Sequence, residues 1–308
     1  MKYIFIVNPN AGKGGIADVI KNDIAALPEK DDCEVILTEA PMHAARIVGE
    51  WCDAHPGEKA RFVACGGDGT INEVFTGAMG RENISVSVYP CGSGNDFIKV
   101  FGEADALKGD FSKYTNVESI INAPERKLDV MKANGRYCIN VLNFGFDTIV
   151  AKTMNELRDK RGHGSKSDYT KGIIKALITA MKTECTVTVD GEVINPRGNM
   201  LLCTFGNGRY VGGSFKCAPR GEIDDGLIEV CLVKPISRLK FVTLLAPYTE
   251  GKHLDNPDFD KLLVYRRGTK LSIDAKPGFA YSLDGEIIYA EHVDVEIIPG
   301  ALSLAIPE

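Results

Sequence analysis

The chain of 308 residues has few of the features that mark several large protein classes. It contains one tryptophan, five scattered histidines and no Cys-x-x-Cys pair. No apolar run approaches the ~20 residues that a membrane-spanning helix needs. Nine cysteines are scattered, several of them inside apolar runs, which favours buried free thiols in a reducing compartment over zinc sites or disulfides. The net charge of −6 gives no support for nucleic-acid binding.

The ends of the sequence and its length set further expectations. Met1–Tyr3 leads directly into a strand pattern, so we expect no secretory signal and a cytoplasmic protein. The length suggests about two domains, at roughly 150 residues each. We predict an α/β domain over residues 1–125, to which 299–308 return, and a second domain over 126–298.

The most informative stretch is Gly66-Gly67-Asp68-Gly69-Thr70-Ile71-Asn72-Glu73. It follows an apolar run at 62–65 and precedes a helical pattern that begins near Asn72. Glycine permits unusual backbone angles and close approach of a ligand. The following helix offers unpaired N–H groups that suit a phosphate. An acid in such a loop indicates a divalent cation between Asp68 and the phosphate. A tight structural turn is the alternative for this stretch alone.

Two further glycine-rich turns repeat this arrangement. Asn8–Gly15 follows a strand pattern at 3–7, and Pro90–Phe97 follows one at 86–89, each with a helical stretch expected next. Neither turn has the spacing of a Walker loop or of a dinucleotide fingerprint. Three such turns would meet at the carboxyl edge of one parallel sheet, where α/β proteins bind ligands.

The remaining pattern assigns a fold class to each half. A strand at 33–38 and a helix at 44–54 complete an α/β domain with a parallel sheet and helices on both faces. Beyond Pro124 short strands dominate and predict an antiparallel β-sandwich with helices at 173–181 and 239–249. The predicted strands of this half are 126–133, 136–144, 185–189, 200–206, 227–233, 261–265, 270–275, 279–283 and 293–298.

At this level of detail the sequence resembles the diacylglycerol kinase and sphingosine kinase-like lipid kinases, particularly the soluble bacterial type. The resemblance covers nearly the whole chain. Its motifs are Asn8-Pro9-x-Ala11-Gly12, Gly66–Glu73, Gly92–Phe97, Leu128-Asp129, Asn143–Asp147 taken as a turn, Gly206-Asn207, Pro219 with Asp224–Leu227, and Leu283–Glu286. It implies a catalytic cleft between the α/β domain and the sandwich, with a last strand at 302–306 that returns to the first domain.

A kinase that acts on an alcohol must position a triphosphate and remove a hydroxyl proton. The resemblance implies that Glu286 accepts that proton and that Asp284 is its partner in an acidic network. It implies that Asp68 and Asp129 hold the catalytic Mg²⁺, with Asp129 otherwise an ordinary exposed strand residue at the start of the second domain. An Asp-Gly turn with a solvated glutamate is the alternative for 284–286 taken alone.

The resemblance also implies the residues that bind ATP. They are Asn8, which orders the first turn, and Thr38, Gly66, Gly67, Asp68, Gly69, Thr70, Ile71, Asn72 and Ser93. Asn95 and Asp96 fit helix capping as well as ligand binding. A second, structural Mg²⁺ is implied at Glu222, Asp225 and the carbonyl of Leu227, and a solvated acidic turn is the alternative.

One basic cluster, Arg158, Lys160, Arg161, His163, Lys166 and Lys171, includes glycines that predict a loop. An anionic bilayer would attract it; a solvated loop is the alternative. We expect a lipid kinase that contacts the inner membrane face peripherally, takes a membrane lipid as substrate and binds no nucleic acid, with a homodimer left open. The rival functions are an NAD-kinase-like phosphorylation of a soluble metabolite and an inactive nucleotide-binding regulator.

Overall fold

The computed structural model describes residues 1–12, 14–161 and 166–307. It divides into two compact units. The first comprises Met1–Val130 and Pro299–Glu308, and the second Met131–Ile298. The first unit ends inside strand β5 (Glu125–Ala133), a few residues beyond the end predicted at residue 125.

The first unit is built on a parallel sheet. Its strands are β1 (Lys2–Val7), β2 (Cys33–Leu37), β3 (Ala60–Gly66) and β4 (Ile84–Pro90), in the order β2-β1-β3-β4. Strands β3 and β4 are buried along their whole length, as expected for central strands covered on both faces. The end of β17 (His292–Ala305) lies parallel beside β4, with Ser303 opposite Ser85.

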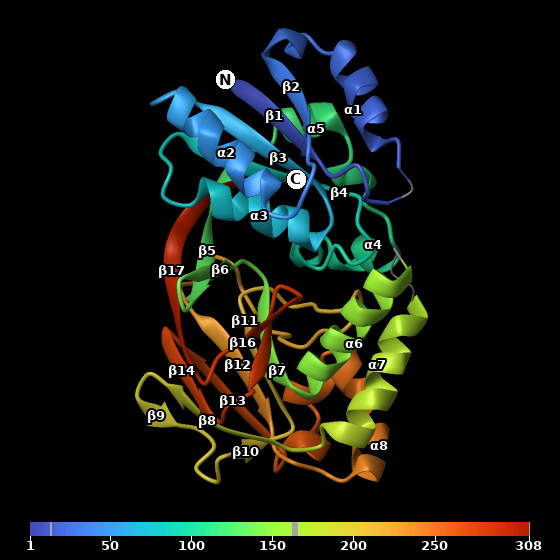
Figure 1. Ribbon diagram of the computed structural model, residues 1–308, viewed down its shortest axis with the longest axis vertical. Coiled ribbons are helices and arrows are strands. Elements are labelled where there is room, and N and C mark those ends of the chain that lie inside the picture. Colours follow the sequence, from blue (N-terminus) through green and yellow to red (C-terminus); the bar gives the residue numbers. More distant parts are fainter. Residues whose placement is uncertain (13, 162–165, 308) are drawn as a thin grey trace. The chain divides into compact units, whose positions relative to one another are not determined.

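Helices cover both faces of this sheet (Figure 1). Helix α1 (Ile16–Ala25) and helix α5 (Val117–Ile121) share one apolar cluster with β1 and β3. Helices α2 (His43–Ala54) and α3 (Asp68–Ala78) pack against each other. The shorter elements are α4 (Glu103–Leu107) and 3₁₀ turns at Lys30–Asp32, Phe97–Val100 and Ser112–Tyr114.

The helix expected after the third glycine turn is a 3₁₀ turn instead, Phe97–Val100. Lys99 reaches back to pair with Asp96, three residues earlier, and donates to the carbonyl of Gly94 at 2.8 Å. Residues at i and i+3 eclipse each other in 3₁₀ geometry, which suits this pairing.

The second unit is a β-sandwich. One sheet has the order β13-β12-β11-β7-β15-β16. The facing sheet has the strand order β10-β8-β14-β17, and it includes the first part of β17. Strand β9 pairs with β8, and β6 pairs with β5. The strands are β6 (Arg136–Cys138), β7 (Val141–Gly145), β8 (Thr183–Val189), β9 (Glu192–Val193), β10 (Asn199–Met200), β11 (Leu202–Gly206), β12 (Ile228–Val233), β13 (Leu263–Gly268), β14 (Lys270–Ala275), β15 (Ala280–Leu283) and β16 (Glu286–Tyr289).

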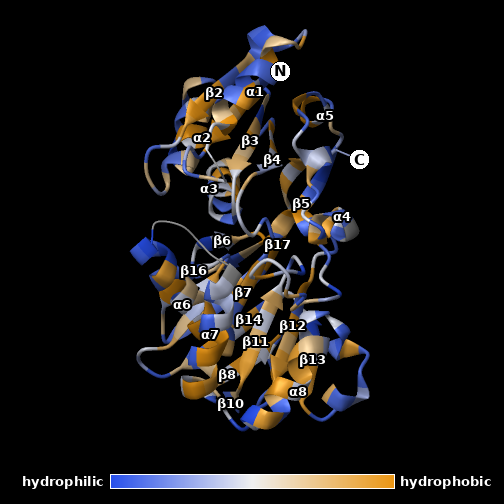
Figure 2. Ribbon diagram, turned by 90° about the vertical axis from the view of Figure 1, so that its right-hand side faces the viewer, coloured by the Kyte–Doolittle hydropathy of each residue, from blue (hydrophilic) through white to orange (hydrophobic). Residues whose placement is uncertain are grey.

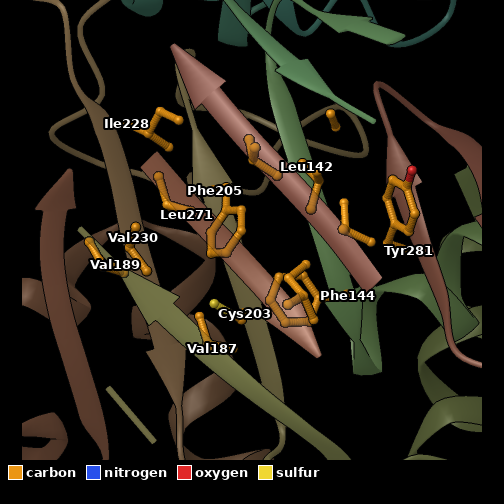
Figure 3. Packing of buried hydrophobic residues seen from close by; sticks show 14 of the residues in the cluster. Leu142, Phe144, Val187, Val189, Cys203, Phe205, Ile228, Val230, Leu271 and Tyr281 are labelled. Carbon is orange, nitrogen blue, oxygen red and sulfur yellow. The ribbon is translucent and has the colours of Figure 1, made fainter. Parts of the chain in front are cut away.

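The period-2 alternation of the six-stranded sheet creates two apolar layers. Leu142, Phe144 and Phe205 point into the sandwich core shown in Figure 3. The alternate residues Leu202 and Val233 belong to a second cluster shared with the helices. Those helices are α6 (Phe146–Arg161), α7 (Lys166–Thr179) and α8 (Arg238–Thr249), with 3₁₀ turns at Lys252–Leu254 and Pro257–Phe259.

Helix α6 is the main element that the sequence did not predict. The sequence predicts a turn at its first residues and a loop at its last. Only a few of its side chains are buried, among them Phe146 and Val150, so its apolar stripe is short. Helix α6 lacks a strong helical periodicity, and its packing against α7 and the sheet stabilises it.

Candidate active site

Three glycine turns meet at the carboxyl edge of the first unit's sheet, after β1, β3 and β4. Their backbones approach so closely that side chains would not fit. A β-carbon on Gly92 would lie 2.3 Å from the Cα of Gly67, and one on Gly12 would lie 2.8 Å from the carbonyl oxygen of Cys91. Gly12 also has a φ of +64°, which glycine adopts readily. The glycines therefore allow three backbone segments to form one surface.

Asp68 joins two of these turns. It begins helix α3, and its carboxylate accepts the backbone N–H of Asp96 at 2.7 Å and that of Phe97 at 3.4 Å. Burial, together with the nearby negative charge of Asp96, raises the pKa of the Asp68 carboxyl above its ordinary value. A cation beside this buried carboxylate would stabilise its ionised form.

The stretch predicted as a loop at 66–72 is in large part the first turn of α3, since the helix begins at Asp68. Gly69, Ile71 and Asn72 therefore lie within that helix. Thr70 is buried beneath Gly66, where a β-carbon would come within 2.3 Å of the threonine Oγ1. The first N–H groups of a helix have no partner within the helix, so the start of α3 is suited to an anion.

The other predicted nucleotide residues lie around this edge. The amide of Asn8 donates to Thr70 Oγ1 at 3.4 Å, and its oxygen accepts the N–H of Asn10 at 3.0 Å, so Asn8 does order the first turn. Thr38 is half-buried directly after β2, and Ser93 is exposed in the third turn. Lys13 of the first turn lies outside the described residues.

Two residues hold the third turn in place: Lys99, which the sequence analysis did not assign, and Asn95, which it assigned to capping or ligand binding. Lys99 is a buried lysine whose ammonium bonds the Gly94 carbonyl and pairs with Asp96. Asn95 brackets Gly92, accepting its N–H and donating to its carbonyl, each at 2.9 Å. Asp96 occupies the N-cap position of the following 3₁₀ turn, as the capping interpretation predicts, but its side chain makes no capping bond. The i,i+3 spacing of Asp96 and Lys99 is the signal that could have revealed their pairing.

The environment of Asp129 differs from the predicted one. It was expected to be exposed at the start of the second domain, yet it is buried in β5 and belongs to the first unit. Its carboxylate accepts the N–H of Gly300 at 2.7 Å. Because that partner lies 171 residues away in sequence, local pattern does not disclose it.

Asp284 has a defined structural role in the second unit. It sits in the Asp284-Gly285 hairpin turn between β15 and β16 with a φ of +46°. Its carboxylate accepts backbone N–H groups from Ile139 at 2.8 Å, Asn140 at 3.1 Å and Val141 at 2.9 Å. Asp284 therefore fastens the hairpin to the β6–β7 connection, a role that the predicted acidic network did not include.

Glu286 follows this turn as the first residue of β16. Its side chain is 66% exposed, and one carboxylate oxygen lies 3.7 Å from the guanidinium of Arg136. The amide of Asn155 in α6 donates to the carbonyl of Gly285 at 3.0 Å, so a second element holds the turn that precedes Glu286. The convergence of Glu286 with Asp68 and Asp129 stays a prediction.

The acidic loop at 222–227 does not present the predicted ligand set. Glu222 is exposed, and the two oxygens of Asp225 accept the N–H of Leu227 at 3.0 Å and pair with Arg267. No group of three or more acidic, histidine or cysteine side chains gathers as a metal site within the described ranges. In this structure the Asp225 carboxylate is therefore engaged by protein donors, and the structural Mg²⁺ at this loop stays a prediction.

The basic cluster is helical where it is described, and not a loop. Arg158, Lys160 and Arg161 end α6, and Lys171 lies in α7. Arg161 pairs with the buried Asp168 through two contacts of 3.0 and 2.7 Å. His163 and the glycines beside it lie outside the described residues.

A polar cavity of about 360 Å³ lies elsewhere in the first unit, lined by residues that include Asp53, His55 and Arg81. Its lining reaches Ile84, the first residue of β4, whereas the glycine turns follow the strands' last residues. It therefore belongs to the opposite edge of the sheet.

Among the helices whose residues are described, none combines the length and apolar character needed to cross a bilayer.

Comparisons with known proteins agree with this architecture. Residues 2–133 match the diacylglycerol kinase catalytic domain, and residues 140–306, over half of the chain, match the YegS C-terminal NAD kinase beta sandwich-like domain. The chain is 27% identical to a diacylglycerol kinase of Bacillus subtilis (strain 168) over 91% of its own length and 88% of that relative's. It is 29% identical to a "probable lipid kinase YegS-like" of Chromohalobacter salexigens, over 94% and 92% of the two chains.

The fold is shared with a crystal structure described as a diacylglycerol kinase of Bacillus anthracis str. Sterne. The TM-score is 0.70 at 20% identity, and the match covers 99% of this chain and 96% of that one. The chain therefore belongs to the family of diacylglycerol kinase and YegS-like lipid kinases.

Proposed function

We propose that this kinase transfers the γ-phosphoryl group of ATP to a hydroxyl of diacylglycerol or a related lipid alcohol, with Mg²⁺ as cofactor. The observation that carries the proposal is the meeting of three glycine turns beside Asp68 at the carboxyl edge of a parallel sheet. The names of the relatives support a lipid acceptor.

The glycine turns suit a triphosphate for two physical reasons. Because Gly67 and Gly92 have no side chain, the two turns pack backbone against backbone and bring their peptide groups to one place. The positive end of α3 attracts negative charge at the same edge. Asn8 and Thr70, which bond each other, keep the first two turns in register.

Asp68 and Asp129 are the carboxylates that would hold Mg²⁺. Both belong to the first unit, and both already accept backbone N–H groups that orient them. The cation would neutralise phosphate charge as it develops during transfer. It would also compensate the charge of Asp68, whose pKa burial raises.

Glu286 is the proposed proton acceptor from the lipid hydroxyl. Its carboxylate is exposed on the second unit, beside a turn fixed by Asp284 and Asn155. In this proposal Asp284 positions the glutamate and does not itself receive a proton. We further propose that the protein works at the cytoplasmic face of a membrane, where its acceptor resides.

The test incubates purified protein with γ-labelled ATP, Mg²⁺ and one acceptor at a time: diacylglycerol in neutral detergent micelles, a sphingoid base in the same micelles, or NAD. We expect label in a phospholipid only when diacylglycerol or a related lipid alcohol is present. Label in NADP would establish a soluble-metabolite kinase instead. ATP binding without turnover on any acceptor would indicate a regulator.

A further inference from the structure

Two helices of the second unit expose large apolar side chains. On α7, Ile174 is 54% exposed and Ile178 is 67% exposed. On α8, Leu239 is 79% exposed and Val242 is 58% exposed. These are β-branched and aliphatic residues with no polar tip, so their exposure leaves apolar surface in water. Figure 2 shows hydrophobic colour along both helices.

The two helices are joined where these side chains occur. The guanidinium of Arg238, at the start of α8, donates to the carbonyl of Leu177 at 2.7 Å and to that of Ile178 at 3.2 Å. These carbonyls lie in the last turn of α7, where a cation is favourable. Ile178 and Leu239 therefore occupy adjoining turns of two helices, and we call Ile174, Ile178, Leu239 and Val242 the α7–α8 face.

The two sequence segments that carry this face contain basic residues and no acids. Residues 169–183 and 234–249 contain no Asp or Glu, although the whole chain has a net charge of −6. The basic side chains of these segments are Lys171, Lys175, Lys182, Lys234, Arg238 and Lys240.

Some of these cations are paired at the margin of the face. Lys175 contacts Glu156 at 3.2 Å, Lys182 contacts Glu184 at 3.5 Å, and Lys240 contacts Asp258 at 3.7 Å. The ammonium of Lys234 donates to the carbonyl of Lys261 at 3.1 Å. Within the part of the chain that the structure describes, Lys171, Lys234 and Arg238 have no carboxylate partner. The face is thus apolar with a positive margin.

We propose that the α7–α8 face docks on the surface of an anionic phospholipid bilayer. Apolar side chains would enter the boundary between headgroups and acyl chains while the basic margin meets lipid phosphates. A symmetric second copy would offer the same surface, whose segments 169–183 and 234–249 contain no acid to pair with Lys171 and Lys234, which disfavours self-association. The proposal rests on the proposed function, because a lipid acceptor requires the enzyme to reach a membrane.

The test measures co-sedimentation with vesicles of phosphatidylcholine alone and of phosphatidylcholine with phosphatidylglycerol. The apolar variant is Ile178→Ser with Leu239→Ser, and its matched control is Val19→Ser, an exposed apolar residue of α1 in the first unit. The charge variant is Lys171→Gln with Lys234→Gln, and its control is the exposed Lys59→Gln.

We expect wild type to bind the anionic vesicles and to bind the neutral ones at least tenfold more weakly. The charge variant should lose about fivefold in anionic-vesicle binding per lysine, which corresponds to about 1 kcal/mol each. The apolar variant should lose about tenfold or more, since binding scales with the apolar area buried. Both controls should bind as wild type does.

Activity on lipid in neutral detergent micelles separates the two proposals. The variants should keep wild-type activity there, because the acceptor is delivered without a charged bilayer. If wild type binds anionic vesicles but phosphorylates no lipid in micelles, the proposed function fails and the docking face stands. Anionic-vesicle binding that both variant pairs leave unchanged would overturn the docking face, as would a dimer in sedimentation velocity that the apolar variant dissociates.

Discussion

The carboxylate of Asp68 accepts the backbone N–H of Asp96 at 2.7 Å, so the turn after β3 is bonded to the turn after β4. A single acidic side chain thus sets the spacing of two segments that the sequence separates by 28 residues. The same carboxylate is the proposed Mg²⁺ ligand, and its structural and chemical roles can be separated by substitution.

Asp68→Asn should keep the fold and lose the reaction. The amide oxygen can still accept the Asp96 N–H, but the charge that would bind Mg²⁺ is gone. We expect kcat for lipid phosphorylation to fall at least about 100-fold. Thermal unfolding at pH 8 should be unchanged or shifted upward, because a buried charge has been removed. Near-normal turnover would refute the role of Asp68.

The closeness of the glycine turns leads to a second prediction. A β-carbon at position 92 would lie 2.3 Å from the Cα of Gly67, so Gly92→Ala must push the two turns apart. We expect ATP binding to weaken at least about tenfold, measured by calorimetry.

The control is Gly49→Ala inside α2, where the new methyl would meet only a side-chain atom of Arg81 at 3.7 Å. Alanine stabilises a helix interior relative to glycine by roughly 0.5–1 kcal/mol. This control should therefore bind ATP normally. Equal ATP affinity in the two variants would contradict the phosphate-binding surface.

Two Asp-Gly hairpins allow the positioning role of Asp284 to be tested against a matched site. Asp190 has the same φ of +46° and accepts two backbone N–H groups, from Thr269 at 3.0 Å and Lys270 at 2.9 Å, where Asp284 accepts three. Asp284→Asn and Asp190→Asn should each destabilise the fold by about 1–3 kcal/mol, measured by urea unfolding.

The two hairpin variants should differ in catalysis. Only Asp284→Asn displaces the turn that precedes Glu286, so it should lower kcat below the wild-type value, while Asp190→Asn should not. Equal activity of the two variants at a temperature where both are folded would show that Asp284 is structural alone.

The sequence predicted the positions of most strands because their apolar patterns are local. The run 136–144, predicted as one strand, forms β6 and β7, the runs 293–298 and 302–306 form the single strand β17, and β9 and β16 were not predicted. Runs such as 3–7 and 62–65 lie within β1 and β3. Helices that are stabilised mainly by packing against other elements were harder to predict from the sequence, and α6 is the clearest example. Its few buried residues give little helical periodicity, and its charged end resembled a solvated loop.

The same difference between local and distant interactions decides which site residues could be predicted from the sequence. The glycine turns could be predicted from the sequence, because no other residue tolerates such close backbone approach. The environments of Asp129 and Asp284 depend on backbone N–H groups 171 and 143–145 residues away. Hydrophobic patterning reports which side of a strand is buried, and it carries no information about which distant donor a carboxylate meets.

Asp147 provides a pH-dependent prediction for stability. It lies in the first turn of α6, its Oδ2 is buried without a hydrogen-bond partner among the described residues, and burial raises its pKa from 3.8 to about 7. A carboxyl whose folded pKa is raised binds its proton more tightly in the native state. Its contribution to stability is therefore full below about pH 4 and is lost as the pH rises through about 7.

Asp147→Asn removes that dependence. The variant's free energy of unfolding, relative to wild type, should increase from pH 4 to pH 7 by up to about 1.4 kcal/mol per pH unit and then level off. Urea unfolding across this range measures it. Glu229, whose pKa burial also raises to about 7, remains in both proteins and cancels in the difference. A difference that stays constant with pH would show that Asp147 titrates normally.

The most direct measurement compares wild type and Glu286→Gln in transfer of the γ-phosphoryl group from ATP to diacylglycerol in micelles, with ATP affinity measured in parallel. Glutamine keeps the size of the side chain and removes its capacity to accept a proton. We predict phosphorylated lipid from wild type, at least about 100-fold less from the variant, and equal ATP affinity. Near-wild-type transfer by Glu286→Gln would contradict the account.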